Sequence, residues 1–320
     1  MPIIKLKAAL KDYIWGGTAL KERFGKHTSL DRVAESWELS CHPDGQSVVE
    51  NGAYEGLALG EYIEKAGRGV LGANCARFEF FPVLIKLIDA KRDLSIQVHP
   101  DDDYARRVEG GYGKTEMWYV VDCEKGARLY YGFKQNVTRE QFGHEIAANT
   151  LETALNAVEV HKGDVFFIDA GTIHAIGAGI LIAEIQQSSN TTYRVYDYGR
   201  MGADGRPREL HVEKALDVTK TAPPCPTSVA DPAPTQESGY TLRRLASCGY
   251  FTVHAVQVMS HAALFADESS FHSVLCIEGG GTISGEGEHY AIGKGDSFFV
   301  PAGLGGYTLE GEMTVIRTTV

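Results

Sequence analysis

The chain has 320 residues, of which 23% are charged and 43% hydrophobic, and this composition is typical of a globular protein with a sizeable core. Its formal net charge of −11 argues against a nucleic-acid-binding surface, although a few local cations could still bind one phosphate. The opening MPIIKLK breaks any apolar run, and no segment approaches the roughly 18 apolar residues of a membrane span. We therefore expect a cytoplasmic protein with no signal peptide and no membrane or nucleic-acid partner.

Short apolar runs punctuated by glycine dominate the sequence, and glycine is abundant, at 36 residues. This pattern is typical of proteins built from many antiparallel strands. In chain order, strands are predicted at residues 117–122, 128–132, 164–169, 179–186, 251–259, 273–278 and 296–301. Helices are predicted at residues 56–67, 101–108, 138–149 and 210–219. The third of these helices opens with Thr138 and Gln141, which have the spacing of a capping box.

A proline-rich stretch, residues 221–238, interrupts these elements with five prolines and no apolar periodicity. Such a composition is typical of a linker or a long surface crossover. The predicted helices all precede it, and only strands are predicted after it. We therefore divide the chain into a helix-decorated part (residues 1–220), the linker, and a purely β tail (residues 239–320).

An internal repeat indicates that the two parts share an architecture. Residues 162–171, KGDVFFIDAG, resemble residues 294–303, KGDSFFVPAG, and the Gly-Asp pair suits a tight turn into a strand. When the copies are aligned without gaps, His174 falls opposite Gly306. This pattern, with a histidine after the first copy, is typical of a cupin barrel. We predict a mainly β double cupin, two jelly-roll barrels with a few added helices, whose C-terminal barrel holds no metal.

Four side chains in strand-like segments form a candidate metal site. Gln97 and His99 lie two residues apart in the segment SIQVHPDD, so both leave the same face of a strand. Glu116 and His174 follow in segments of their own. An amide, two imidazoles and a carboxylate make a mixed nitrogen and oxygen set that suits zinc or another borderline divalent metal. An incomplete protein shell leaves one position for water or substrate, as catalytic metal sites do.

Six longer motifs run along the chain, namely KDYIWGG (residues 11–17), AESWELS (34–40), FPVLIK (81–86), SIQVHPDD (95–102), GKTEMW (113–118) and EIQQSSNTTYRVYDYGR (184–200). Together they resemble the motifs of type I mannose-6-phosphate isomerases in their short bacterial form, and the resemblance covers nearly the whole chain. The resemblance implies reversible isomerisation of mannose 6-phosphate and fructose 6-phosphate through a cis-enediol or enediolate. It also implies one zinc ion per chain, bound at the positions of Gln97, His99, Glu116 and His174.

An aldose–ketose isomerase must move a proton between C1 and C2 of the open sugar and stabilise the enediolate. Glu184 is the first candidate for the base, because it precedes Arg194 by ten residues, as the proposed base does in the family. Lys114, two residues before Glu116, is the competing candidate, and the choice between them stays open. The resemblance places Arg194 in the active site, where its planar cation suits an enediolate or a phosphate.

Three further residues are predicted to contact a phosphorylated hexose. Lys86 lies in an apolar run, where an unpaired ammonium is costly, so a substrate phosphate is a sensible partner for it. Ser95 lies two residues before Gln97, on the same predicted strand face, and could donate to the phosphate. Trp15 is expected to wall the sugar pocket. We expect the enzyme to be a monomer or a weak homodimer.

Two other functions fit parts of this pattern. A double-cupin oxygenase would bind iron, nickel or copper, but such sites often use three histidines and a glutamate, so Gln97 counts against it. The cations Lys86, Lys114 and Arg194 also favour a phosphorylated substrate. A non-catalytic sugar-binding module predicts a damaged ligand or base set in the first barrel, and the sequence shows no such damage.

Overall fold

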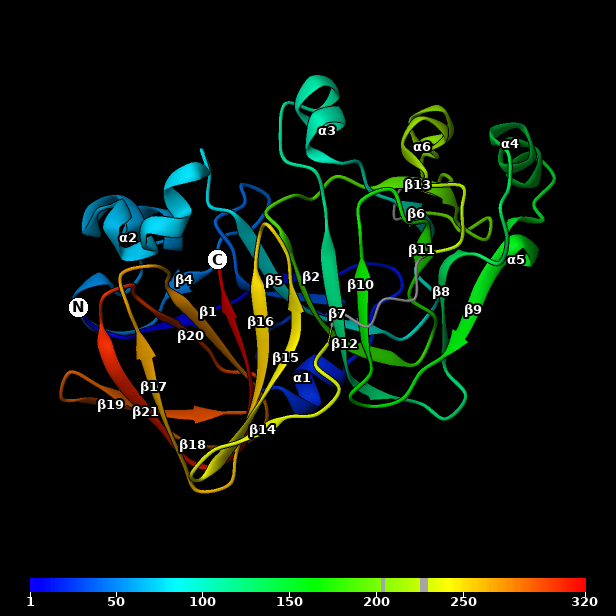
Figure 1. The fold of residues 1–320 in the computed structure, drawn as a ribbon. Helices are drawn as coiled ribbons and strands as arrows, with labels where there is room; N and C mark the ends of the chain where they lie inside the picture. The colour runs from blue at the N-terminus through cyan, green and yellow to red at the C-terminus, as the bar shows by residue number, and fades with distance from the viewer. Residues whose placement is uncertain (203–204, 225–229) are drawn as a thin grey trace.

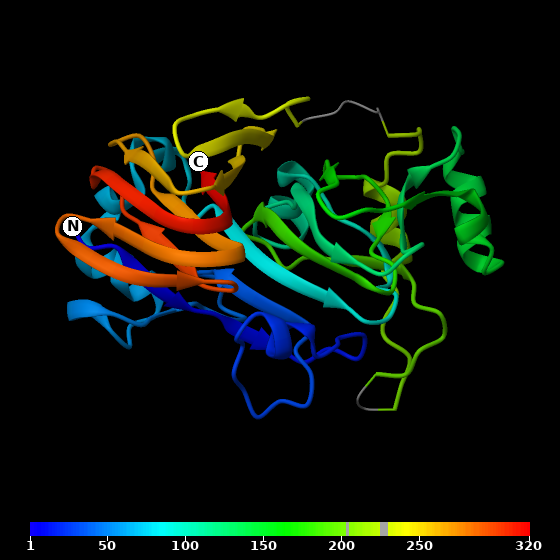
Figure 2. The same ribbon diagram turned by 90° about the horizontal axis from the view of Figure 1, so that it is seen from below.

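A computed structural model describes residues 1–202, 205–224 and 230–320. These residues form two β-rich lobes that lie side by side, and both chain termini lie in the same lobe (Figure 1). The view from below shows the same two lobes, with most of the helices at the periphery (Figure 2). The predicted mainly β fold with a few helices is confirmed.

The lobe that holds both termini is built on one ten-stranded antiparallel sheet. Its strands are β1 (Ile4–Lys7), β4 (Val48–Val49), β14 (Thr235–Gln236), β15 (Tyr240–Ser247), β16 (Thr252–Val258), β17 (His261–Ala266), β18 (His272–Gly285), β19 (Glu288–Gly293), β20 (Ser297–Val300) and β21 (Gly305–Thr319). The order is β14-β15-β16-β21-β18-β20-β1-β4, with β17 paired to β21 and β19 paired to β18. Because β1 pairs with β20, the first strand of the chain extends a sheet made mostly by the C-terminal part.

The second lobe contains two smaller antiparallel sheets. One has the order β10-β7-β12-β5-β3-β2, and its strands are β2 (Ala9–Lys11), β3 (Glu35–Leu39), β5 (Val83–Ala90), β7 (Glu116–Cys123), β10 (Val165–Ile168) and β12 (Ile180–Gln187). The other has the order β13-β6-β11-β8-β9, and its strands are β6 (Ile96–Val98), β8 (Arg128–Phe133), β9 (Leu155–Glu159), β11 (His174–Ala175) and β13 (Tyr193–Tyr196). Every residue of β5 and β12 is buried, so both faces of these neighbouring strands are covered.

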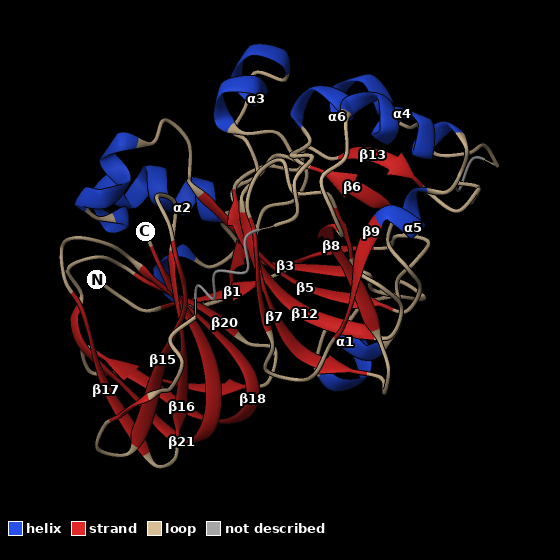
Figure 3. Cartoon of the chain, turned by 45° about the vertical axis from the view of Figure 1, so that its right-hand side comes forward, coloured by secondary structure: helices blue, strands red, loops and turns tan. Residues whose placement is uncertain are grey.

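Most helices gather at one end of the two lobes (Figure 3). The predicted helices are confirmed as α2 (Leu59–Ala66), α3 (Asp102–Val108), α4 (Arg139–Ala147) and α6 (Val212–Val218). Thr138 and Gln141 cap α4 reciprocally, because each side chain accepts a hydrogen bond from the backbone amide of the other. The structure adds the short helices α1 (Ala19–Arg23) and α5 (Leu151–Ala154), and 3-10 turns at Gly52–Tyr54, Arg68–Leu71 and Ala73–Arg77. Within the described ranges, no helix has the length and apolar character to cross a membrane.

The seven predicted strands correspond to β7, β8, β10, β12, β16, β18 and β20. The division into residues 1–220, 221–238 and 239–320 stays a prediction, and residues 225–229 of the linker lie outside the described residues. The first of these blocks supplies β1 and β4 to the ten-stranded sheet of the other lobe. The two lobes therefore share strands from the N-terminal part of the chain.

Candidate active site

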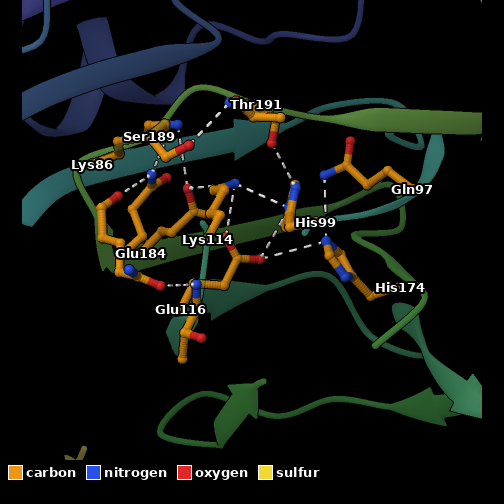
Figure 4. Close-up of polar contacts among 12 residues, drawn as sticks. Lys86, Gln97, His99, Lys114, Glu116, His174, Glu184, Ser189 and Thr191 are labelled. Atoms are coloured by element: carbon orange, nitrogen blue, oxygen red, sulfur yellow. Dashed lines mark hydrogen bonds and ion pairs between the residues drawn. The ribbon is translucent and has the colours of Figure 1, made fainter. Parts of the chain in front are cut away.

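The four predicted metal ligands converge between the two smaller sheets (Figure 4). Gln97 on β6 pairs with His174 at the start of β11, while Glu116 begins β7 on the other sheet. One ligand atom each of His99, Glu116 and His174 lies within 4.8 Å of the other two, and all three side chains are buried. Among the described residues, this is the only group of three or more histidine, cysteine or carboxylate side chains with this arrangement.

Hydrogen bonds to backbone carbonyls orient both histidines. Nδ1 of His99 lies 2.9 Å from the carbonyl oxygen of Thr191, and Nδ1 of His174 lies 2.9 Å from that of Thr172. A carbonyl can only accept, so each Nδ1 carries the proton and each Nε2 keeps a lone pair for a metal. These Nε2 atoms lie 3.7 Å and 3.4 Å from Oε1 of Glu116. Burial lowers the pKa of His99 well below its usual range and that of His174 to about 4, so both rings are neutral.

Gln97 lies at the edge of this group. Its amide nitrogen lies 3.4 Å from Nε2 of His174, and its amide oxygen lies 3.4 Å from Oγ of Ser95. The oxygen and nitrogen of an amide have nearly the same shape, and exchanging them would place the oxygen beside the histidine nitrogen. In that orientation the amide oxygen of Gln97 would lie next to the proposed ligand atom of His174.

The Glu116 carboxylate is fully buried, and it faces Lys114 and the two histidine rings. Burial and then repulsion from Glu184 raise the pKa of Glu116 to about 7, against the attraction of Lys114, whose Nζ lies 2.8 Å from Oε2. A buried carboxylate is costly unless it faces cations. Together with two neutral imidazoles, it makes a donor set that fits a divalent metal.

A row of charges lies beside the ligands, with Glu184 between Lys86 and Lys114 (Figure 4). Glu184 on β12 is paired with Lys86 on β5 and with Trp118 on β7. Its Oε1 lies 3.4 Å from Nζ of Lys86 and 3.9 Å from Nζ of Lys114. Its Oε2 accepts a 2.9 Å hydrogen bond from the Trp118 indole. Burial alone would raise the pKa of Glu184, but the two lysines outweigh it and lower the pKa, so the carboxylate is ionised.

Lys86 is buried between two carboxylates. Its Nζ lies 3.5 Å from Oε2 of Glu35, 3.4 Å from Oε1 of Glu184 and 5.0 Å from the centre of the Trp37 ring. The Trp37 indole donates to Glu35 at 2.6 Å and so fixes that carboxylate. Burial alone would lower the pKa of Lys86, but Glu35 and Glu184 outweigh it and raise the pKa. The ammonium therefore stays charged without a substrate.

Arg194 on β13 marks the opposite end of the site. Its Nε lies 3.3 Å from Oγ of Ser95, and one terminal nitrogen donates to a backbone carbonyl at 2.9 Å. The nearby carboxylate of Asp197 pairs instead with Arg200 and Arg208. Among the described residues, no carboxylate forms an ion pair with Arg194, so its guanidinium is available to an anion.

These groups line one cavity of about 250 Å³. Seven of the predicted residues line it, namely Trp15, Lys86, Ser95, Gln97, Lys114, Glu184 and Arg194. The remaining three, His99, Glu116 and His174, lie directly behind Gln97 and Lys114. The sequence analysis missed five polar lining residues, namely Tyr13, Glu35, Asn190, Thr192 and Arg208. Two of them could have been found from the sequence, because Tyr13 and Glu35 each lie two residues before a tryptophan of a family motif.

Two family models match the chain: phosphomannose isomerase type I, catalytic domain, over residues 3–126, and mannose-6-phosphate isomerase, cupin domain, over residues 241–320. Mannose-6-phosphate isomerase ManA of Bacillus subtilis is 42% identical over 307 residues, 95% of this chain and 95% of that protein. The chain belongs to the type I mannose-6-phosphate isomerase family. A second member, from Streptococcus mutans, is 38% identical across 98% of this chain and 96% of its own. The crystal structure of the mannose 6-phosphate isomerase from Bacillus subtilis, 36% identical, matches 100% of both chains with a TM-score of 0.93.

Membership in this family confirms three predictions, namely the family itself, the double-cupin fold and the enzyme class of aldose–ketose isomerase. It also argues against the oxygenase and the sugar-binding module. The charged cavity fits the confirmed class, because moving a proton next to a carbonyl needs a base and a source of positive charge.

Proposed function

We propose that this protein interconverts mannose 6-phosphate and fructose 6-phosphate, with one zinc ion per chain. The observation that carries the proposal is the buried group of His99, Glu116 and His174, next to the ionised Glu184, in a member of this family. The metal group and the base together supply what an aldose–ketose isomerisation needs.

The residues that would hold the zinc are His99 and His174 through Nε2, Glu116 through its carboxylate, and Gln97 through its amide oxygen. The neutral rings and the buried carboxylate next to their Nε2 atoms support this assignment. When bound, zinc would polarise the sugar carbonyl and stabilise the negative charge that develops on its oxygen. Cobalt, manganese and nickel suit related donor sets, so zinc is the part of the proposal that metal analysis must test.

Glu184 is proposed as the base that carries the proton between C1 and C2. A base must be unprotonated, and the neighbouring lysines lower the pKa of Glu184. Lys114 is the competing candidate, but an ammonium cannot accept a proton, and its Nζ lies 3.1 Å from Nε2 of His99 and 2.8 Å from Glu116. We assign Lys114 to the stabilisation of negative charge beside the ligands.

The substrate phosphate is proposed to bind Arg194, Arg208 and Ser95. This end of the cavity has an excess of positive charge, because Arg194 has no carboxylate partner within the described ranges and the single carboxylate of Asp197 is shared by Arg200 and Arg208. Its planar fork suits a phosphate, and Ser95 can donate a further hydrogen bond. The alternative is a phosphate on Lys86, which would place a dianion beside the two carboxylates that already neutralise this lysine.

A coupled assay tests the proposal. Purified protein is assayed for fructose 6-phosphate formation from mannose 6-phosphate, before and after chelation and zinc add-back. We expect activity that chelation removes and zinc restores. No activity in metal-replete protein would contradict the proposed reaction, whereas activity that resists complete metal removal would contradict only the zinc. A cytoplasmic location and a monomeric or weakly dimeric state stay predictions.

A further inference from the structure

The C-terminal lobe carries its own cluster of polar side chains, at the position that corresponds to the active site of the other lobe. Its members come from strands β15, β16, β18 and β21, namely Arg244, His254, His272, Tyr307 and Arg317. No part of the proposed isomerisation uses them. The correspondence follows from the strand register, one strand at a time.

The sequence repeat aligns residues 162–171 with residues 294–303. It therefore aligns Ile168, the last residue of β10, with Val300, the last residue of β20. Ile168 is paired with Glu116 on β7. Val300 is paired with His272 on β18. His272 therefore occupies the position of the proposed metal ligand Glu116.

The next strands continue the correspondence. Arg317 on β21 takes the place of Glu184 on β12. Glu184 is paired with Trp118, two residues after Glu116, and Arg317 is paired with Val274, two residues after His272. His254 then lies opposite Arg317, as Lys86 lies opposite Glu184. On the next strand, Arg244 is paired with His254, as Trp37 is paired with Lys86 in the other lobe. The pairing register shifts just after Arg244 and just after Trp37.

The exchanged side chains reverse the charge of the site. Where the first lobe has the carboxylates of Glu116 and Glu184, the second has the imidazole of His272 and the guanidinium of Arg317. A guanidinium has five N–H donors and no lone pair to give, so it repels a metal ion and attracts an anion. The same strand positions therefore favour a ligand of opposite charge.

The contacts inside the cluster leave donors unused. Nδ1 of His272 lies 2.8 Å from the hydroxyl of Tyr307, and these residues are only 7% and 2% exposed. In the tautomer in which Tyr307 donates to Nδ1, the other ring nitrogen of His272 carries the proton and is a further donor. A terminal nitrogen of Arg317 lies 3.3 Å from Nδ1 of His254, while its Nε is shut off from solvent and has no hydrogen-bond partner.

The positive charge of Arg317 is also unmatched. The carboxylate of Asp231 pairs with Arg244 at 2.7 Å, and no carboxylate in the described part of the chain forms an ion pair with Arg317. A shielded guanidinium nitrogen without an acceptor is costly unless a ligand supplies one. A small oxyanion would supply several acceptor oxygens at once.

We propose that the C-terminal lobe binds a small oxyanion of the phosphate class between Arg317, His254 and His272. Arg317 supplies the charge and a planar pair of donors, and the imidazoles supply further N–H groups. The ligand is either free phosphate or a phosphate ester. The site is distinct from the catalytic cavity, none of whose lining residues belongs to this cluster.

Nuclear magnetic resonance of ring-labelled histidines in the zinc-loaded enzyme tests this site. One titration uses inorganic phosphate and the other uses fructose 6-phosphate, both at constant ionic strength. The signals of His254 and His272 are assigned with H254Q and H272Q. We expect both signals to shift saturably, at a different midpoint from those of His99 and His174. Saturation by inorganic phosphate assigns the site to free phosphate, and saturation by the sugar phosphate alone assigns it to an ester.

Two variants sharpen the test. R317M keeps an unbranched apolar stem and removes the charge, so affinity should fall at least about tenfold while isomerase activity stays unchanged. R243M is the matched control, because Arg243 precedes Arg244 on β15 and points to the opposite face of the strand, and it should bind like the unaltered protein. If neither histidine signal moves at tens of millimolar of either ligand, or if R317M shifts as readily as the unaltered protein, the proposal is wrong.

Discussion

The two lobes place polar side chains at the same register positions and give them opposite electrostatic character. In the N-terminal lobe, Glu116 and Glu184 lie among neutral histidines and two lysines. In the C-terminal lobe, His272 and Arg317 occupy the equivalent positions, next to a further histidine. The fold therefore fixes where these groups lie close together, while the side chains decide which ligand they can bind.

The same comparison explains why a metal is expected in only one lobe. In the N-terminal lobe, two histidine Nε2 atoms point toward one carboxylate at 3.4 Å and 3.7 Å. In the C-terminal lobe, the position of His174 falls to Gly306 and that of Glu116 to His272, so a nitrogen donor and the carboxylate are both lost.

Removing a proposed metal ligand should produce the largest difference between substitutions in the two lobes. His174→Ala should lose bound zinc and lower kcat by at least about a thousandfold, because the neutral ring and its lone pair disappear. His272→Ala, at a buried histidine of the other lobe, should keep a full equivalent of zinc. Elemental analysis and the coupled assay measure both. Stoichiometric zinc in His174→Ala would reject the proposed ligand set.

Neutralising Glu184 tests the base. Glu184→Gln should keep zinc and lower kcat by roughly a hundredfold to ten-thousandfold, because the amide cannot accept the proton. Lys114→Met, the competing candidate, should lose less in kcat. The pH profile of kcat distinguishes them, since loss of the base removes the acid limb of the profile. A larger kcat loss in Lys114→Met, together with a retained acid limb in Glu184→Gln, would transfer the role to Lys114.

The two ends of the cavity should differ in how they affect KM. Arg194→Ala should raise KM for mannose 6-phosphate by about tenfold or more, because it removes a guanidinium that no carboxylate of the described residues neutralises from the proposed phosphate site. Lys86→Met should act mainly on kcat, because Lys86 neutralises Glu184 and Glu35. Initial rates over a range of substrate give both constants. The opposite pattern, with KM affected mainly by Lys86, would place the phosphate there.

The buried histidines of the C-terminal lobe should make stability depend on pH. Burial lowers the pKa of His272 to about 3 and that of His254 to about 4. In the unfolded chain both rings take up a proton as the pH falls below about 6.5, but in the folded protein they stay neutral, so the free energy of unfolding decreases as the pH falls from about 6.5 toward 4. His272→Gln should reduce this decrease by on the order of 1–3 kcal/mol. Urea unfolding from pH 7 to pH 4 measures it, with His289→Gln, at an exposed histidine, as control. Equal slopes in the two variants would contradict the prediction.

Local patterns predicted much of the fold and most of the site. The two-residue spacing of Gln97 and His99 predicted that both would reach one site, and they do, although β6 ends at Val98, one residue before His99. The pair of Thr138 and Gln141 fixes the start of α4. These signals lie within a few residues, so they can be read without knowing the tertiary structure. The ligand assignments also relied on the family motifs, because spacing alone left several roles open.

Long-range pairing explains what the sequence analysis missed. The strands β1 to β4 are two to five residues long and carry little periodicity of their own. The partners of Lys86 could not be predicted either, because they lie on strands that are distant in the sequence. Its burial predicted a charged partner, but only the register of β3, β5 and β12 identifies Glu35 and Glu184. Arg208 lies in a loop, where no periodicity marks it as part of the cavity.

The pairing of β1 with β20 has a consequence for synthesis on the ribosome. At about 5–20 residues per second, β1 emerges many seconds before its partner is translated. Ile4 and Leu6, which are buried in the finished protein, have only the short β4 as an early partner. The nascent chain therefore carries an unpaired strand edge through most of translation, which is a target for chaperones. A chain released before β20 would leave that edge exposed permanently.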